Sequence, residues 1–225
     1  MTPRLRLVLF DVDGTLVDSQ ADIISAMRVA FGDVGLPCPD REAVLSIVGL
    51  SLDHAMARLT PQQPETVHAA LVLAYKSAFR VQRLAGAELP VLFPGAREMI
   101  DQLSAEPDIL LGVATGNSQR GIEGMLDTLG LQKVFVTRQV ADHHPSKPHP
   151  SMILTAISET GVDTVDTVMV GDTSYDMDMA RAAGVAGIGV SWGYHAREHL
   201  HAASRMIDRF ADLPNALDAI WKETT

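Results

Sequence analysis

Short apolar runs alternate along this chain with segments whose apolar residues recur at helical spacing. The five runs are Leu5–Phe10, Ile109–Ala114, Val134–Thr137, Val165–Val170 and Ala186–Val190. Nearly continuous apolar runs of this length are typical of strands buried on both faces of a parallel sheet. Helical patterns at Met99–Leu103, Ile122–Leu129 and Met152–Ile157 accompany them, and Gly130 and Gly161 close the last two. The alternation predicts an α/β fold with a doubly wound, Rossmann-like parallel sheet.

One long stretch departs from this alternation. From Ser19 to Ala87, about seventy residues, only helical periodicity is found. The candidate helices are Ala21–Phe31, Ala43–Val48, Leu52–Leu59 and Glu65–Leu84. Such a stretch is too long for an ordinary crossover between strands. We therefore predict an all-helical cap domain, residues 18–87, inserted into a core domain formed by residues 1–17 and 88–225.

Composition narrows the class of partner. The 225 residues are 47% hydrophobic and 20% charged, which favours a packed core over disorder. With 18 Lys and Arg against 28 Asp and Glu, the net charge is −10. This balance argues against a nucleic acid or an anionic membrane as partner, because both require a basic surface. An anionic substrate would need a local positive site, such as a metal ion beside a lysine.

The same counts bear on location. The single cysteine, Cys38, can form no disulfide within the chain, as is typical of proteins in a reducing compartment. The first residues carry no signal-peptide pattern, and no apolar run approaches the roughly 18 residues of a membrane span. We expect a cytoplasmic protein, either a monomer or a homodimer.

The first polar motif, Asp11-Val12-Asp13-Gly14-Thr15, follows the first apolar run. If the chain turns at Gly14, both carboxylates can face one pocket. One carboxylate can then attack phosphorus, and the other can protonate the leaving oxygen and later deprotonate a water molecule. The alternative is a solvated acidic turn with no chemical role.

Two further motifs follow later strands. Thr115-Gly116-Asn117-Ser118 offers a hydroxyl and backbone N–H groups at a helix start, which suits a phosphate group, although simple N-capping requires the same residue types. Lys147 stands in Ser146-Lys147-Pro148-His149-Pro150 just before a helix. Beside carboxylates, its ammonium would keep a nucleophile ionised; alternatively it is an ordinary exposed lysine.

The fourth motif is Gly171-Asp172-Thr173-Ser174-Tyr175-Asp176. Two acids at i and i+4 ahead of a helix suit Mg²⁺, which prefers one or two carboxylates together with waters and a phosphate oxygen. The alternative is a helix start that carries acids because they interact favourably with its dipole. Since ligands of parallel sheets bind at the carboxyl ends of the strands, we expect all four motifs to converge.

The ordered set D-V-D-G-T, T-G-N, K-P and G-D-T-S-Y-D resembles the haloacid dehalogenase superfamily of phosphohydrolases. The resemblance is strongest to its phosphoglycolate-phosphatase-like branch, which carries a helical (C1) cap after the first motif, and it covers essentially the whole chain. It implies that Asp11 is the nucleophile and a Mg²⁺ ligand. Asp13 would be the general acid and base and would give the metal its backbone carbonyl. A true dehalogenase lacks this second aspartate, so dehalogenation is not expected.

The resemblance also implies roles for the other motifs. Thr115, Gly116 and Asn117 would lie by the transferring phosphoryl group, and Lys147 would bind it. Asp172 and Asp176 would hold Mg²⁺ or its waters. Within the expected cap, Val48-Gly49-Leu50-Ser51 resembles the loop that faces the substrate, which places Gly49 at the site.

The expected function is therefore Mg²⁺-dependent hydrolysis of a small phosphorylated metabolite, such as phosphoglycolate, through an aspartyl phosphate. A phosphomutase or a pyrophosphatase on the same fold is an alternative. A phospho-accepting regulatory protein without turnover is another, although the presence of Asp13 argues against it. Histidines at His143-His144 and at His195 and His199 stay unassigned; the latter pair has zinc-binding spacing on a helix but no evident third ligand.

Overall fold

A six-stranded parallel sheet forms the centre of the computed structural model, which describes residues 4–84 and 90–223. Its strands are β1 (Arg6–Phe10), β4 (Ile109–Thr115), β5 (Phe135–Val140), β6 (Thr167–Gly171), β7 (Ala186–Val190) and β8 (Arg205–Ile207). They lie in the order β5-β4-β1-β6-β7-β8, and each neighbouring pair is parallel. Strands β4 and β5 lie on one side of β1, and β6, β7 and β8, which come later in the chain, lie on the other. The carboxyl end of β1 is therefore at the point where the strand order reverses. The predicted α/β fold is confirmed.

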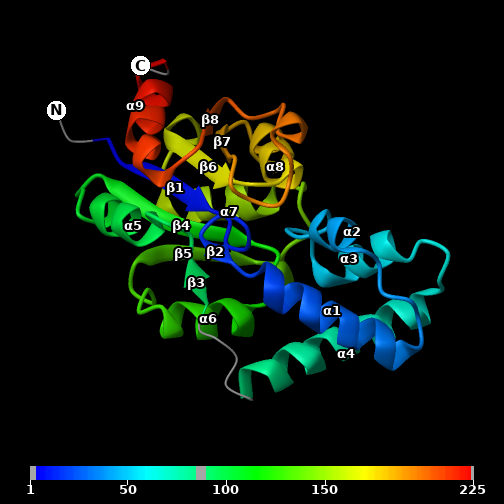
Figure 1. Ribbon diagram of the computed structural model, residues 1–225. Helices are drawn as coiled ribbons and strands as arrows, with labels where there is room; N and C mark the ends of the chain where they lie inside the picture. The colour runs from blue at the N-terminus through cyan, green and yellow to red at the C-terminus, as the bar shows by residue number, and fades with distance from the viewer. Residues whose placement is uncertain (1–3, 85–89, 224–225) are drawn as a thin grey trace.

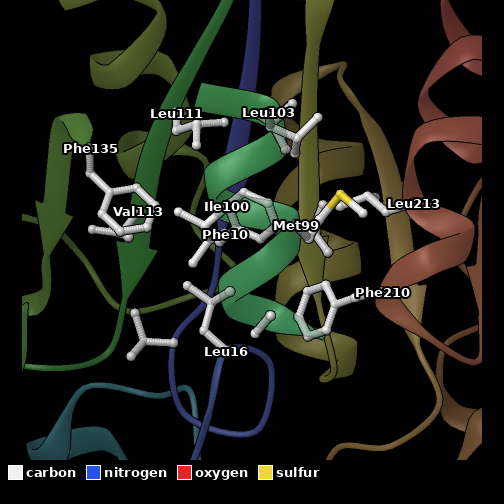
Figure 2. Packing of buried hydrophobic residues seen from close by; sticks show 14 of the residues in the cluster. Phe10, Leu16, Met99, Ile100, Leu103, Leu111, Val113, Phe135, Phe210 and Leu213 are labelled. Carbon is white, nitrogen blue, oxygen red and sulfur yellow. The ribbon is translucent and has the colours of Figure 1, made fainter. Parts of the chain in front are cut away.

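Helices cover both faces of this sheet (Figure 1). They are α5 (Ala96–Ser104), α6 (Gln119–Thr128), α7 (Ser151–Thr160), α8 (Ser174–Ala183) and α9 (Leu213–Glu223). Alternate residues of β1 serve the two faces: Val8 and Phe10 pack with α5, α6 and α9, whereas Leu7 and Leu9 pack with α7 and α8. Figure 2 shows Phe10 meeting Met99 and Ile100 of α5. Burial on both faces is the reason why these strands are almost continuously apolar.

Four helices separate β1 from β4 in the sequence: α1 (Gln20–Val34), α2 (Arg41–Leu45), α3 (Leu52–Leu59) and α4 (Glu65–Leu84). They gather to one side of the sheet, beyond the carboxyl end of β1 (Figure 1). Their buried side chains, among them Met27, Phe31, Met56 and Leu71, form a cluster separate from the two that flank the sheet. We call α1–α4 the helical segment, and the six-stranded sheet with the helices and loops around it the sheet domain.

The chain enters and leaves the helical segment through a small antiparallel ribbon. Strands β2 (Val17–Asp18) and β3 (Val91–Leu92) pair in it, with Val17 opposite Leu92 and Asp18 opposite Val91. The division into residues 18–87 and the remainder stays a prediction, and its boundary at 87/88 lies outside the described residues.

Several element bounds differ from the sequence predictions. The run Val165–Val170 begins in a 3₁₀ turn, Thr164–Asp166, with an exposed Val165, and the strand runs one residue further, to Gly171. The strand predicted at Val134–Thr137 extends to Val140 through polar residues, which its apolar run did not indicate. Gln139 is tolerated inside because its side-chain amide forms hydrogen bonds with Glu159 and His144. Helix α2 ends at Leu45, not Val48. The sequence analysis missed β2, β3 and β8, strands of only two or three residues, which are too short to show a period.

None of the helices in the described part of the chain is both long and apolar enough to span a membrane.

Candidate active site

Lys147 lies at the centre of a buried charge cluster. Its Nζ is 2.8 Å from Oδ1 of Asp11, which follows β1, and 2.7 Å from Oδ1 of Asp176 in the first turn of α8. Only 2% of the lysine is exposed. Burial alone would lower its pKa, but Asp11 and Asp176 outweigh burial and raise the pKa above its ordinary value. The interpretation of Lys147 as an exposed loop lysine is therefore wrong.

Asp172, directly after β6, is fixed through both of its carboxylate oxygens. Thr15 donates its hydroxyl to Oδ1 at 2.8 Å, and the backbone N–H of Tyr194 donates to Oδ2 at 2.8 Å. Two glycines make room for this carboxylate. A Cβ added to Gly193 would lie 2.1 Å from the Cβ of Asp172, and one added to Gly14, whose φ is +86°, would lie 2.3 Å from Oδ2. The chain turns at Gly14 as expected. Glycine is required there because its φ is positive and because a side chain would collide with Asp172.

Asp176 has two functions at once. Its Oδ2 accepts hydrogen bonds from the backbone N–H and the hydroxyl of Thr173, at 3.0 and 2.6 Å, which completes a capping box at the start of α8. Its Oδ1 accepts from Lys147. The helix-start interpretation of this acid is therefore confirmed, and the same carboxylate also faces Lys147, while its role at a metal stays a prediction.

Asp11, Asp172 and Asp176 form a three-carboxylate cluster. Ligand oxygens from the three residues lie within 4.8 Å of one another, all three residues are buried, and no other group of three metal-ligating residues occurs in the described chain. Oδ2 of Asp11 is buried without a hydrogen-bond partner among the described residues. An all-carboxylate set with an unpartnered buried oxygen fits a hard cation such as Mg²⁺.

The cluster concentrates negative charge where water cannot solvate it. Burial raises the pKa of Asp11 well above its ordinary value, with Asp176 and Asp172 adding to the effect and Lys147 opposing it. Burial and then Asp176 raise the pKa of Asp172 to about 7. A bound cation would relieve both effects, because it stabilises the ionised carboxylates.

Asp13 and Asn117 meet beside this cluster. The Asn117 side-chain amide donates to Oδ2 of Asp13 at 2.6 Å, and its backbone N–H donates to the hydroxyl of Thr115 at 3.1 Å. Ser118, not Asn117, caps α6, since its hydroxyl accepts from the N–H of Gly121. The motif after β4 thus provides both the cap of the alternative interpretation and a contact to the first motif.

The helical segment comes into direct contact with this site. A Cβ added to Gly116 would lie 2.6 Å from the carbonyl oxygen of Leu50 and 2.8 Å from that of Gly49. Gly49, with φ +98°, also faces Thr173, whose hydroxyl would be 3.3 Å from a Cβ. The loop expected to face the substrate therefore lies over the turns that carry Gly116 and Asp176.

Two tyrosines near Asp13 were not predicted as site residues. The hydroxyl of Tyr194 accepts from the backbone N–H of Ser19 at 2.9 Å. Burial, followed by Asp13, raises the pKa of Tyr75 on α4. Tyr194 follows β7 at the edge of the sheet where the four motifs lie, and that position is a usable signal. Tyr75 belongs to an ordinary amphipathic helix, and its spacing carries no signal. Trp192 packs between Phe93 and Phe210 and donates to the carbonyl of Thr15.

No histidine belongs to a group of three metal-ligating residues in the part of the chain that the structure describes. His195 and His199 lie on a turn and a 3₁₀ helix rather than an α-helix, with ring centroids 6.4 Å apart. His144 instead joins a network: its Nε2 lies 2.8 Å from Oε1 of Gln139 and its Nδ1 2.8 Å from Oγ of Ser151. Gln139 in turn donates to Glu159. The network links β5 to the start of α7, on either side of the loop that carries Lys147.

Comparison with known proteins gives consistent matches. The family model described as "Haloacid dehalogenase-like hydrolase" matches residues 8–190. A "Probable phosphatase IndB" of Dickeya dadantii is 40% identical over 96% of this chain and 95% of its own length. A "Phosphoglycolate phosphatase" of Agrobacterium fabrum is 32% identical over 85% of this chain and 83% of its own length. A crystal structure of a predicted phosphoglycolate phosphatase from Haemophilus somnus superposes with a TM-score of 0.83 at 23% identity, covering 96% of this chain and 99% of that one.

Proposed function

This chain belongs to the haloacid dehalogenase-like hydrolases and is a phosphatase, and on that premise we propose that it hydrolyses a small phosphate ester with Mg²⁺ through an aspartyl phosphate on Asp11. The observation that carries the proposal is the state of Asp11. One carboxylate oxygen is held by Lys147, and the other is buried without a partner beside two further carboxylates. An ionised oxygen without a partner, next to a cation site, is what attack on phosphorus requires.

Each residue of the site has a definite task in this mechanism. Asp11 attacks the phosphorus atom. Lys147 favours its ionised form, to which a bound cation would add, and neutralises charge on the phosphoryl oxygens. Asp13, oriented by Asn117, gives a proton to the leaving oxygen and then takes one from the water that attacks the aspartyl phosphate. Thr115 and Gly116 bind the phosphoryl oxygens at the turn after β4.

Asp11, Asp172 and Asp176 would hold the metal, together with the backbone carbonyl of Asp13. When bound, Mg²⁺ supplies positive charge that stabilises the phosphoryl group during transfer. Thr15 and the Tyr194 N–H hold Asp172 in place, and Thr173 holds Asp176.

The helical segment acts as the cap, with Gly49 and its neighbours closing over the turn at Gly116 and excluding water. The most favoured substrate is phosphoglycolate, because several relatives that are 28–32% identical bear that name. Phosphate transfer to an isomer and pyrophosphate hydrolysis remain alternatives for the same site. The non-catalytic regulatory protein does not, since the relatives are named as phosphatases.

The test is phosphate release from phosphoglycolate, sugar phosphates, nucleotides and pyrophosphate, with Mg²⁺ or with EDTA. We expect Mg²⁺-dependent release that Asp11→Asn reduces at least about a thousandfold, because the nucleophile is lost. The exposed Asp33→Asn, the same change on α1, should retain full activity. Full activity of Asp11→Asn would overturn the mechanism, and an isomeric product without free phosphate would replace hydrolysis by transfer.

A further inference from the structure

The backbone carbonyl of Ser46, just after α2 in the helical segment, accepts two hydrogen bonds from the sheet domain. The hydroxyl of Tyr175 donates at 2.8 Å, and Nε2 of His195 lies at 3.1 Å. Tyr175 is in the first turn of α8, and His195 is in the loop after β7. Neither residue takes part in the proposed chemistry.

The tautomer of His195 follows from its other nitrogen. The backbone N–H of Ser174 points at Nδ1 from 3.2 Å, and a backbone N–H can only donate. Nδ1 is therefore the acceptor, and the ring proton is on Nε2, where it is donated to Ser46. The imidazole is thus a neutral bridge between the start of α8 and the helical segment.

Aromatic contacts hold the two donors in position. The rings of Tyr175 and His195 meet edge to face with centroids 5.2 Å apart. The guanidinium of Arg58, on α3, lies 5.6 Å from the centroid of the Tyr175 ring. Both sides of the boundary therefore contribute to the contact: Ser46 and Arg58 from the helical segment, Tyr175 and His195 from the sheet domain.

The contact lies close to the proposed site. Ser46 lies three residues before Gly49, and a Cβ on Gly49 would lie 3.6 Å from the ring of Tyr175. Tyr175 is followed by Asp176, a carboxylate of the three-carboxylate cluster. On the other side of the same loop, the N–H of Ser51 donates to the hydroxyl of Ser146, next to Lys147.

We propose that Tyr175 and His195 form a clasp on the Ser46 carbonyl that positions the loop of residues 46–50 over the active site. They are positioning residues for the phosphatase reaction, and this assignment of their role rests on the function proposed above. Because the clasp consists of two hydrogen bonds to one carbonyl, the loss of either one loosens the closed arrangement without altering the metal ligands.

The clasp is sensitive to acid. A proton on Nδ1 of His195 would leave the N–H of Ser174 without an acceptor. It would also place a cation at the amino end of α8, near His199 and near Arg58 of α3, with the Ser46 carbonyl and Asp176 opposing this effect. Burial lowers the pKa of His195, with His199 and Arg58 acting in the same sense. Because the pKa of His195 is lowered, the neutral ring, which also accepts from Ser174, prevails through the ordinary histidine range and is lost only at lower pH.

The test compares Tyr175→Phe, His195→Ala and His195→Gln, with His201→Ala, an exposed histidine nearby, as the matched control. The first readout is hydrogen exchange of the Val48, Leu50 and Ser51 amides. We expect it to be about threefold to tenfold faster in Tyr175→Phe and His195→Ala, as the loss of one hydrogen bond implies, and unchanged in His201→Ala. His195→Gln keeps a donor within reach and should exchange more slowly than His195→Ala.

The second readout is kinetic. KM for the best substrate should rise about threefold to tenfold in Tyr175→Phe and His195→Ala, with Mg²⁺ affinity unchanged. The acid limb of kcat/KM that His195 causes should be absent in His195→Gln. Unchanged amide exchange in both clasp variants would overturn the clasp, whatever the activity. Absence of phosphate release by the wild type would instead overturn the proposed function, and amide exchange would still decide the clasp.

Discussion

Among the single residues that the structure describes, Lys147 is the one that forms two buried ion pairs at once. It is buried between Asp11 and Asp176, so its removal leaves two buried carboxylates without the cation that neutralises them. We predict that Lys147→Met lowers the free energy of unfolding by about 3–5 kcal/mol, the usual cost of breaking a buried ion pair from one side. Urea unfolding measures this.

Mg²⁺ should recover part of that loss, because the cation can neutralise the same carboxylates. The exposed Lys133→Met is the control and should change stability by less than about 0.5 kcal/mol. A Lys147→Met protein as stable as the wild type in EDTA would contradict the buried ion pair.

The polar residues of the site could be predicted from the sequence to different degrees. Asp11, Lys147 and Asp172 follow separate strands or loops, and their convergence follows from parallel strands ending at one edge. The burial of Lys147 could not be predicted, because a proline-rich loop of this kind is equally compatible with an exposed lysine. Neither was Tyr75, whose place near Asp13 depends on how the helical segment lies against the sheet domain.

Among the elements, α8 links fold and chemistry through its first turn. Thr173 caps the helix, and the same hydroxyl fixes Oδ2 of Asp176. We predict that Thr173→Ala lowers the free energy of unfolding by about 0.5–2 kcal/mol, the usual cost of losing such a cap. It should also weaken Mg²⁺ binding by about tenfold or more, because Asp176 loses its orienting donor. Thermal unfolding and calorimetric Mg²⁺ titration measure the two effects.

Thr173→Ser is the matched control, since it keeps the hydroxyl and should stay within about 0.5 kcal/mol of the wild type. If Thr173→Ala lost stability but bound Mg²⁺ normally, the cap would be structural only.

Helices and strands could be predicted where they are long enough for the spacing of apolar residues to repeat. Helices α3 and α4 have the predicted bounds, because several turns of apolar spacing and clear polar ends mark them. Gly161 ends α7 in a left-handed conformation, as its position indicated. Strand β8, Arg205–Ile207, was not predictable, because three residues give no alternation and its place depends on pairing with β7.

For the molecule as a whole, the carboxylate cluster predicts an unusual dependence of stability on pH. Asp172 in the folded, metal-free protein has a pKa of about 7, raised by burial and Asp176, so the folded state keeps a proton that the unfolded chain releases near its ordinary pKa. The proton on Asp172 then contributes up to about 4 kcal/mol to the free energy of unfolding. This contribution is fully present below about pH 4 and is lost as pH rises to about 7. Asp11 acts in the same direction.

Urea unfolding in EDTA across this range measures the effect. Asp172→Asn removes the titrating group, so the stability of the wild type relative to this variant should fall as pH rises. Saturating Mg²⁺ should abolish the fall, because the cation takes the place of the proton. A difference between the two proteins that is flat with pH would contradict the raised pKa.

The pairing of β2 with β3 bears on how chains of this kind diversify. Asp18 and Val91 are direct neighbours across the ribbon, so the sheet domain meets the helical segment as one loop with adjoining ends. The pairing of the two strands fixes the ends of that loop, whatever the lengths of the helices between them. We therefore expect that helices away from the loop at Gly49 can be lengthened or exchanged without moving Asp11. New specificities would then arise by mutation within a single stretch of the gene, while the residues of the proposed site stay unchanged.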